Sequence, residues 1–507
     1  MKKNILQYLE ENEKKLKNKT IFAETDRQVS YSDFINHSKK VGTFINNIIN
    51  EINKPIVIFI DKKIECLEAM FGTIYSGNFY TILDVHSPKE RMNLIFKTLT
   101  PSMIITNKKN YKKIENENVN IPIYLYEDAI ETDINKEKLQ GIRNRMIDTD
   151  LMYVLFTSGS TGIPKGIAVC HRSAIDYASF IIEKFNINTE TVFGSQTPFY
   201  FSMSVLDVFS TVMAGATLYI IPKMYFSFPV KLLNFMNDKK INTIYWVPSA
   251  LSIVANFKAL EDIQLPKLKT ILFAGEVMPV KQLNYWMNHV DALYANLYGP
   301  TEVTDICTYY VVDRKFKNDE SLPIGKACNN CNVLIIKDNG KEAKKNEEGE
   351  LCVRGSFLAL GYYNNPNKNK ECFIQNPLNN KYPETIYKTG DIVKYNEKGE
   401  LIFLHSKDFQ IIHMGYRIEL GEIEKIVNSI EEVLNCACIY DEKESKIVLF
   451  YQSNQLGEKQ VSSQLRKMLL PYMMPNKIIQ LIKMPYNQNG KIDRIVLKNN
   501  YINKKYE

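Results

Sequence analysis

The chain has 507 residues, more than one ordinary domain holds, so we expect two to four folding units with ample apolar material for a core. A hydrophobic content of 45% and a charged content of 24% are typical of a globular protein. The net charge of +7 is spread thinly over a large surface, which argues against nucleic-acid binding.

Targeting and redox signals are also absent from the sequence. No apolar run approaches the ~18 residues of a membrane-spanning helix, and residues 1–20 carry charges where a signal peptide needs an apolar region. The nine cysteines are scattered and odd in number, which argues against a disulfide framework. Cys328 and Cys331 form a CxxC pair, but no second pair completes a zinc site. We expect a cytoplasmic protein with no membrane partner.

From residue 55 to about residue 302, short β-rich runs alternate with helical stretches. The apolar runs predict strands over 55–60, 79–84, 151–157, 216–222, 243–248 and 269–276. Helices are predicted over 63–77 and 171–185. Continuous apolar strands that alternate with helices indicate an α/β fold of layered, largely parallel sheets.

The character of the sequence changes after Gly325. Residues 332–355 predict a hairpin with a polar turn, and further β structure follows to residue 405. From Asp408 onward we expect helices over 417–430 and 462–473 and strands over 436–441, 446–452 and 477–484. The sequence therefore predicts a large N-terminal domain, 1–407, of layered α/β sheets with a β-barrel-like subdomain, and a small α+β C-terminal domain, 408–507.

The predicted strand at 151–156 runs directly into the loop TSGSTGIPKG, residues 157–166. Its glycines permit close backbone approach, and its hydroxyls and single lysine suit phosphate oxygens. The P-loop pattern fails because Lys165 is followed by Gly166, and the dinucleotide fingerprint fails because the glycine spacing is wrong. The alternative is a merely flexible glycine–serine loop.

This loop resembles the signature loop of the adenylate-forming superfamily, which includes acyl- and aryl-CoA ligases, luciferases and nonribosomal peptide synthetase adenylation domains. Further matching segments follow in the family's order: NLYGPTEVT (296–304), GELCVRGSFLALGYYNN (349–365), YKTGD (387–391), DFQIIHMGYRIELGEIE (408–424) and NQNGKIDR (487–494). The resemblance covers nearly the whole chain. FAGEVMP, SLPIGKA and GYRIELGEIE make it most similar to amino-acid adenylation domains and D-alanine–carrier protein ligases.

The resemblance implies an enzyme, an AMP-forming acid–thiol ligase. A substrate carboxylate would attack the α-phosphorus of ATP to give an acyl-adenylate and pyrophosphate, with Mg²⁺ on the phosphates. The phosphopantetheine thiol of a separate carrier protein would then take the acyl group. The carboxylate is already an anionic nucleophile, so no general base is needed, and positioning and charge neutralisation remain for the enzyme to supply. The family also implies a monomer.

The resemblance assigns roles to particular residues. Thr301 would contact the α-phosphate, Glu302 would hold Mg²⁺, and Lys491 would be the catalytic lysine on the C-terminal lid, which swings about a hinge at Asp408. The nucleotide-binding set comprises Thr157, Ser158, Gly159, Ser160, Thr161, Gly162, Lys165, Asn296, Leu297, Tyr298, Gly299, Asp391 and Asp408, with Asp391 on the ribose and Tyr298 near the adenine. The structural alternatives are a surface glutamate, a buried structural aspartate, a core tyrosine and a solvated lysine.

Two positions depart from the family pattern. Ser406 replaces an arginine that supports the nucleotide, and Ser202 stands where an aspartate pairs the substrate α-ammonium. An unpaired buried ammonium is costly, so an ordinary α-amino acid is disfavoured. Asp305 could instead pair an amino group further from the carboxylate, as in a β- or ω-amino acid, or it could simply turn to solvent. The matched pocket positions are Ser202, Met203, Leu206, Trp246, Leu272, Ala274, Leu297, Asp305 and Ile306.

Two other functions stay open at this point. The apolar pocket lining also suits an aryl or acyl acid lodged against Trp246 and transferred to coenzyme A. Ser406 raises the alternative of an inactive nucleotide-binding homologue, against which stand Lys491, Glu302 and Asp391. Sixteen residues follow Lys491, so we expect the carrier to be a separate protein.

Overall fold

The computed structural model describes residues 2–117, 119–157, 163–317, 320–407, 410–485 and 492–506. These residues form two compact units. The first comprises Met1–Val85, Leu99–Phe156 and Gly166–His405, and the second comprises His86–Thr98, Thr157–Lys165 and Ser406–Glu507. The second unit thus takes two short segments from the first half of the chain. The sequence also predicts that residues 1–407 and 408–507 are separate domains, and this boundary stays a prediction.

A seven-stranded sheet forms one layer of the first unit. Its order is β18 (Gly361–Tyr362), β8 (Lys165–Cys170), β7 (Leu151–Thr157), β4 (Phe79–Ile82), β3 (Pro55–Phe59), β5 (Met103–Thr106) and β6 (Ile123–Leu125). The pairs around β3 and β5 are parallel, whereas β18 runs antiparallel to β8. Every residue of β3 is buried, which explains why it reads as one continuous apolar run.

A nine-stranded sheet forms the second layer. Its order is β15 (Lys326–Ala327), β14 (Thr308–Val311), β13 (Leu293–Tyr298), β12 (Thr270–Ala274), β11 (Thr243–Trp246), β9 (Val192–Ser195), β10 (Thr217–Ile220), β1 (Thr20–Ala23) and β2 (Gln28–Ser30). The strands from β13 to β1 are parallel. Because the carboxyl ends of parallel strands share one edge, the loops after β9, β11, β12 and β13 lie where open α/β sheets bind ligands.

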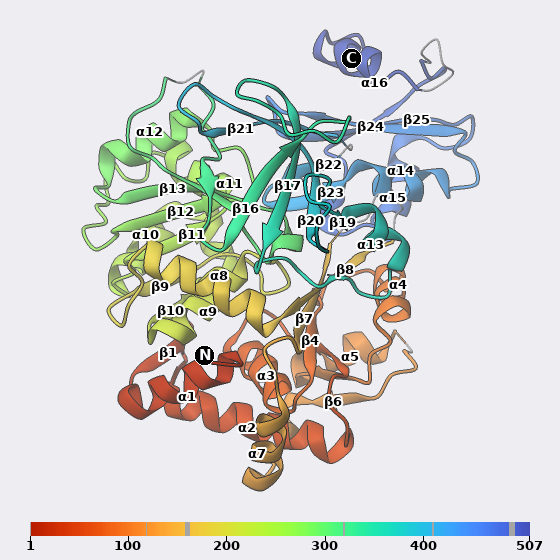
Figure 1. Ribbon diagram of the computed structural model, residues 1–507. Coiled ribbons are helices and arrows are strands. Elements are labelled where there is room, and N and C mark those ends of the chain that lie inside the picture. Colours follow the sequence, from red (N-terminus) through yellow and green to blue (C-terminus); the bar gives the residue numbers. More distant parts are fainter. Residues whose placement is uncertain are drawn as a thin grey trace. The chain divides into compact units, whose positions relative to one another are not determined.

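Helices cover these two sheets (Figure 1). They are α1 (Ile5–Leu16), α2 (Tyr31–Ile48), α3 (Ile64–Tyr75), α5 (Lys108–Glu115), α6 (Tyr126–Ala129), α7 (Lys136–Arg145), α8 (His171–Lys184), α9 (Ser204–Ala214), α10 (Pro229–Asp238), α11 (Pro248–Asn256), α12 (Val280–His289) and α13 (Pro366–Cys372), with short turns η1 (Lys223–Ser227) and η2 (Thr301–Val303). A Cβ on Gly72 of α3 would lie 2.5 Å from Cβ of Val41, so glycine is what lets α3 approach α2 so closely.

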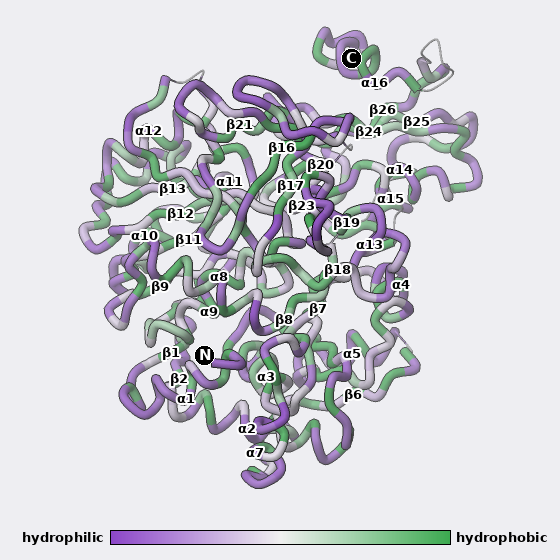
Figure 2. The backbone as a smooth tube through the Cα atoms, viewed as in Figure 1, coloured by the Kyte–Doolittle hydropathy of each residue, from purple (hydrophilic) through white to green (hydrophobic). Residues whose placement is uncertain are grey.

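Hydropathy follows this layering. Figure 2 shows interior strands such as β7 and β8 largely green and the peripheral helix α7 with hydrophilic stretches. Within the part of the chain that the structure describes, no helix combines the length and the apolar character that a bilayer crossing requires.

An antiparallel sheet completes the first unit. Its strands are β16 (Cys331–Ile336), β17 (Gly349–Gly355), β20 (Thr385–Tyr395) and β19 (Phe373–Gln375), and β21 (Leu401–Ser406) pairs with β20. The predicted hairpin is confirmed, since Cys331 pairs with Gly355 and Ile336 with Glu350. The predicted α/β fold class, with a β-rich subdomain and a smaller C-terminal portion, is confirmed.

The second unit is a smaller α+β body. It contains α4 (Lys89–Leu99), β22 (Gln410–His413), β23 (Tyr416–Glu419), α14 (Leu420–Asn428), β24 (Asn435–Asp441), β25 (Lys446–Gln452), α15 (Glu458–Leu465), η3 (Pro471–Met473), β26 (Lys477–Gln480) and α16 (Arg494–Ile502). Its own apolar core includes Ile423 and Leu449.

Two predicted helices of this unit need correction. The helix predicted from residue 417 begins only at Leu420, because Arg417 pairs with Ile412 and Ile418 with Ile411 in a hairpin. The helix predicted over 462–473 ends at Leu465, and Pro471 starts a separate 3₁₀ turn. Leu470 is extended, as the residue before a proline prefers, so one helix cannot continue through to Met473.

Candidate active site

The loop that joins β13 to β14 folds back on itself at the carboxyl edge of the nine-stranded sheet. The backbone N–H of Cys307 donates to the carbonyl of Tyr298 at 2.8 Å. A Cβ on Gly299 would lie 2.4 Å from the Cα of Ile306, so only glycine fits at this crossing. Thr304 adopts a φ of +74°, a costly conformation for a β-branched residue. This loop carries five of the predicted site residues, Gly299, Thr301, Glu302, Asp305 and Ile306.

The beginning of the loop brings together the two residues predicted to hold the nucleoside. The hydroxyl of Tyr298 donates a hydrogen bond to Asp391 Oδ2, although the two residues are 93 positions apart. Burial, with the Asp391 carboxylate beside the ring, raises the pKa of Tyr298. The backbone N–H of Asp391 is held in turn by the Thr389 hydroxyl at 3.0 Å. A carboxylate fixed in this way can accept hydrogen bonds from a diol.

The residues predicted to surround the α-phosphate also meet. Thr301 Oγ1 lies 3.1 Å from Ser202 Oγ, which precedes α9. Glu302 is fully buried, and its Oε1 accepts a hydrogen bond from the Tyr362 hydroxyl at 2.7 Å. The structure therefore joins one predicted catalytic residue, Thr301, to one predicted substrate residue, Ser202.

The sheet register shows which predicted pocket residues share a face. Leu272 of β12 lies beside Tyr245 of β11, and Ala274 lies beside Leu297 of β13. Because side chains alternate between the two faces of a strand, these four residues line one face. Trp246 pairs with Phe273 and belongs to the other face.

The contacts of Trp246 agree with that register. Its indole N–H donates to the carbonyl of Gly194 at 2.8 Å, and its ring packs edge-on against Phe226 with the centroids 5.1 Å apart. The residue beside the predicted pocket is therefore Tyr245, one position earlier. Motif matching missed it because a one-residue offset in a strand exchanges the two faces.

Asp305 does not turn to solvent. Only 3% of its surface is exposed, and its Oδ2 accepts hydrogen bonds from the hydroxyls of Tyr177 at 2.6 Å and Tyr245 at 3.1 Å. Burial raises the pKa of Asp305 to about 7, although the two hydrogen bonds oppose the shift. Tyr177 comes from the middle of α8, and no sequence motif pointed to it.

The remaining pocket candidates are apolar and buried. Leu206 and Ile306 are fully enclosed, and Met203 is 8% exposed. A Cβ on Gly275 would lie 3.3 Å from the Met203 sulfur, so Met203 lies next to the turn that follows β12. These side chains supply an apolar wall beside Ser202.

A buried charge pair lies near this wall. The Lys62 ammonium donates to the carbonyl of Ser195 at 2.9 Å, and its charge is balanced by that of Asp207 on α9. Burial lowers the pKa of Lys62 and raises that of Asp207. Neither residue was predicted from the motifs. Ser195, whose carbonyl Lys62 contacts, pairs with Tyr245 in the sheet, so Lys62 lies near that end of β11.

The glycine-rich loop is described only at its two ends. Thr157 ends β7, and in the second unit the Lys165 ammonium lies 3.2 Å from Glu419 Oε1, with both side chains nearly enclosed. Ser158, Gly159, Ser160, Thr161 and Gly162, together with the predicted hinge Asp408 and the predicted catalytic Lys491, lie outside the described residues. The roles assigned to them stay predictions.

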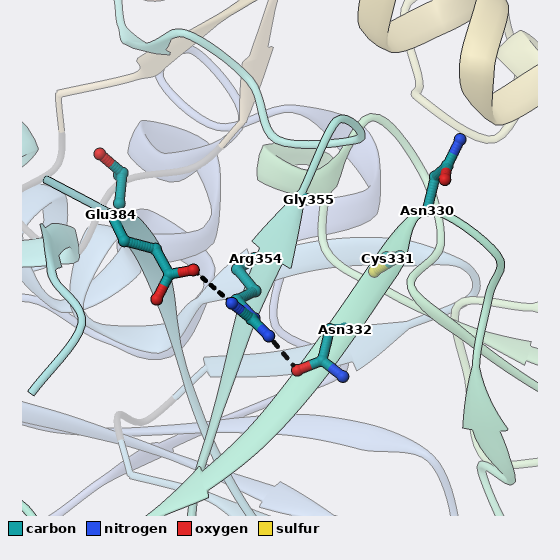
Figure 3. Close-up of a pocket in the computed structure, with 7 residues that line it drawn as sticks. Asn330, Cys331, Asn332, Arg354, Gly355 and Glu384 are labelled. Carbon is teal, nitrogen blue, oxygen red and sulfur yellow. Dashed lines mark hydrogen bonds and ion pairs between the residues drawn. The ribbon is translucent and has the colours of Figure 1, made fainter. Parts of the chain in front are cut away.

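Two other features bear on the assignments. The side-chain amide of Asn296 donates to the carbonyl of Pro323 at 2.9 Å, a bond within the fold that uses one of its two N–H donors. A surface hollow of about 370 Å³ lies on β16 and β17 (Figure 3), but Arg354 there already pairs with Glu384 and Asn332. The hollow shares no residue with the candidate site. Among the described residues, no group of three His, Cys, Asp or Glu side chains could hold a metal ion.

Comparison with known proteins shows extensive similarity. Residues 9–363 match the family model described as AMP-binding enzyme. The chain is 31% identical over 450 residues to zwittermicin A synthase ZmaJ of Bacillus cereus, covering 87% of this chain and 84% of that protein. It is 27% identical to a D-alanine–D-alanyl carrier protein ligase of Bacillus cytotoxicus, covering 97% and 98% respectively. The structure of the Vibrio cholerae adenylation domain AlmE with glycyl-adenosine-5′-phosphate matches with a TM-score of 0.85 at 21% identity, covering 99% of this chain and 98% of that one.

Proposed function

Because the chain belongs to the family of AMP-binding enzymes and is an adenylate-forming ligase, we propose that it activates an amino-substituted carboxylic acid as its acyl-adenylate and transfers the acyl group to the phosphopantetheine thiol of a separate carrier protein in the cytoplasm. The observation that carries this proposal is the 3.1 Å contact between Thr301 and Ser202. It joins the residue matched to the α-phosphate with the residue matched to the acid.

The adenylation step needs no base from the protein. The substrate carboxylate oxygen forms a bond to the α-phosphorus, the bond from that phosphorus to the bridging oxygen breaks, and pyrophosphate leaves with the electron pair. Asp391 and Tyr298 hold the nucleoside, and Thr301 orients the α-phosphate. The protein therefore contributes alignment and charge stabilisation to this step.

Magnesium fits the same site. Glu302 is a fully buried carboxylate whose Oε1 accepts a hydrogen bond from the Tyr362 hydroxyl, and anionic carboxylate oxygens are ligands that a hard cation prefers. Glu302 would hold Mg²⁺, which when bound neutralises phosphate charge. The Tyr362 hydroxyl orients the carboxylate for that purpose.

The position of the substrate's amino group follows from two substitutions in the pocket. Ser202 offers a hydroxyl where α-amino-acid domains carry an aspartate, so an α-ammonium group has no carboxylate there. Asp305 supplies a buried carboxylate elsewhere on the wall, beside Tyr245. We therefore favour a β- or ω-amino acid over an ordinary α-amino acid.

A carrier protein is the acceptor that the relatives support. The D-alanine–D-alanyl carrier protein ligase aligns with 97% of this chain, including the segment 408–424. A second candidate function is the activation of an aryl or acyl acid and its transfer to coenzyme A. The buried apolar side chains Met203, Leu206 and Ile306 favour it. The two candidates differ in both the acid and the thiol.

The experiment is ATP–pyrophosphate exchange by the full-length protein with α-, β- and ω-amino acids and with benzoate-type acids. It is followed by acyl transfer to holo-carrier protein, to apo-carrier protein and to coenzyme A. We expect exchange with a β- or ω-amino acid and transfer only to holo-carrier. Faster turnover of an aryl acid with coenzyme A would replace the proposal by the second candidate. Absence of exchange with every acid would indicate an inactive homologue.

A further inference from the structure

Three side chains from separate elements meet at one carboxylate oxygen. Tyr177 of α8 and Tyr245 of β11 both donate to Asp305 Oδ2, at 2.6 and 3.1 Å. The tyrosines are 0% and 1% exposed, and the aspartate is 3% exposed. Across the described ranges, Oδ1 of Asp305 takes no hydrogen bond. One carboxylate oxygen is therefore fixed by two hydroxyls and the other is left for another partner.

The backbone around this trio is fixed at some cost in strain. Thr304, which precedes Asp305, adopts a φ of +74° and donates its hydroxyl to the carbonyl of Phe357 at 2.7 Å. The ring of Phe357 packs edge-on against Tyr177, with the centroids 5.6 Å apart. The same residue thus supports both the loop that aims Asp305 and one of the tyrosines that hold it. Strain of this kind persists where the surrounding structure enforces it, and it is common at ligand sites.

The charge near the trio is not balanced. The Lys62 ammonium donates to the carbonyl of Ser195 and interacts electrostatically with Asp207. Within the described part of the chain, no lysine, arginine or histidine forms an ion pair with Asp305. A buried carboxylate that has only neutral donors remains costly until a proton or a cation joins it.

The ionisable surroundings agree with that reading. Burial, and secondarily the charge of Asp207, raise the pKa of Asp305 to about 7. The hydroxyl of Tyr153 is buried beside it and makes no hydrogen bond to any described residue. The titratable groups that face Asp305 from the elements around it are Tyr153 of β7, Tyr177 of α8, Asp207 of α9, Tyr245 of β11 and Cys328.

We infer that Tyr177 and Tyr245 are positioning residues for substrate choice: they fix Asp305 so that its second oxygen receives the substrate's ammonium group. This inference rests on the proposed function and deepens it, because it names the residues that select an acid with an amine remote from the carboxylate. The aspartate supplies the charge, and the two hydroxyls supply its orientation. The ammonium group in turn balances the buried charge that the fold leaves unpaired.

The test compares amino acids with analogues in which a methyl group replaces the ammonium. The probes are 3-aminopropanoate against butanoate and 4-aminobutanoate against pentanoate, in ATP–pyrophosphate exchange by the full-length protein from pH 6 to pH 9. Asp305→Asn is expected to raise KM for the preferred amino acid at least about tenfold and to leave that of its analogue nearly unchanged. Tyr177→Phe and Tyr245→Phe are each expected to raise it about threefold to tenfold.

A pH profile separates positioning from simple structural support. The ionised form of Asp305 pairs with the ammonium, so kcat/KM for the amino acid rises as pH passes upward through the pKa of that carboxyl. Each tyrosine hydrogen bond favours the ionised form, so either Tyr→Phe change moves this acid limb to higher pH. Tyr294→Phe is the matched control, because its hydroxyl donates to the carbonyl of Val290 and touches none of the trio. It is expected to leave the profile in place.

The outcomes distinguish this inference from the proposed function. If the Tyr→Phe variants slow amino acid and analogue equally, with an unmoved acid limb, the tyrosines are structural and the inference is wrong. Exchange by the wild type with an acid that Asp305→Asn does not affect would overturn the inference while the proposed function stands. Absence of exchange with every acid would overturn both. Should Asp305→Asn fail to fold, the tyrosine variants decide, since each removes a single oxygen.

Discussion

Replacing Asp305 by asparagine should make the protein more stable at alkaline pH. The amide keeps a carbonyl oxygen that can accept from Tyr177 and Tyr245, but it removes the buried charge. The pKa of Asp305 is raised from 3.8 to about 7 in the folded protein. Between these values the native state holds more protons than the unfolded chain, so the contribution of this group to stability falls as pH rises through that window.

The separation of about three pH units sets the size of the effect. At about 1.4 kcal/mol per unit, the ionised carboxylate lowers the free energy of unfolding by up to about 4 kcal/mol at pH 8 relative to pH 4. We expect the free energy difference between Asp305→Asn and the wild type to grow by several kcal/mol over that range. Urea unfolding curves at pH 4.5, 6 and 8, followed by tryptophan fluorescence, measure it.

An exposed aspartate provides the matched control. Asp238, at the end of α10, lies on the surface, and its change to asparagine should leave the pH dependence of the wild type intact. A pH dependence of Asp305→Asn that runs parallel to that of the wild type would refute the reasoning. It would mean that the carboxylate is already compensated in the folded protein.

Three further outcomes follow from the site. Asp391→Asn should raise KM for ATP at least about tenfold in pyrophosphate exchange and leave KM for the acid nearly unchanged, because Asp391 is matched to the ribose. Trp246→Phe should lower the free energy of unfolding by about 1–3 kcal/mol in urea, because the carbonyl of Gly194 loses its donor. KM for the acid should not change, and a raised KM would contradict the placement of Trp246 on the other face of the sheet. Lys491→Ala should abolish adenylate formation and largely spare transfer from a synthetic acyl-adenylate to holo-carrier, and equal loss of both half-reactions would refute that role.

Much of the sheet architecture could be predicted from the sequence. The run 55–60 is apolar at every position, and 244–248 nearly so, because both faces of a parallel sheet are covered. The second unit was less predictable near Arg417, where a charged helical pattern begins three residues before the helix does. The hairpin that Ile418 forms with Ile411 prevails there over local propensity.

The candidate site shows why local patterns identify a motif more readily than a face. The apolar run 243–248 locates β11, but only the register with β12 decides that Tyr245 and not Trp246 shares a face with Leu272. Tyr177 belongs to no sequence motif, because its place in the site depends on its hydrogen bond to Asp305, 128 residues later in the chain. Site residues that lie within one short motif could be predicted from the sequence. Contacts between residues from distant segments could not.

The tight crossing at Gly299 links two tasks that the enzyme keeps separate chemically. Tyr298, which precedes it, donates a hydrogen bond to Asp391, the residue predicted to bind the ribose, and Ile306, against whose Cα the glycine lies, adjoins Asp305, which we propose for the acid. Substitutions at positions 305 and 306, at the far end of the loop, should therefore alter the proposed acid subsite while Gly299 and its neighbours keep the predicted nucleotide contacts. Because Gly299 lies against Ile306, the two ends of the loop cannot move independently. Binding of a nucleotide beside Tyr298 should therefore restrict the motion of Asp305 and Ile306.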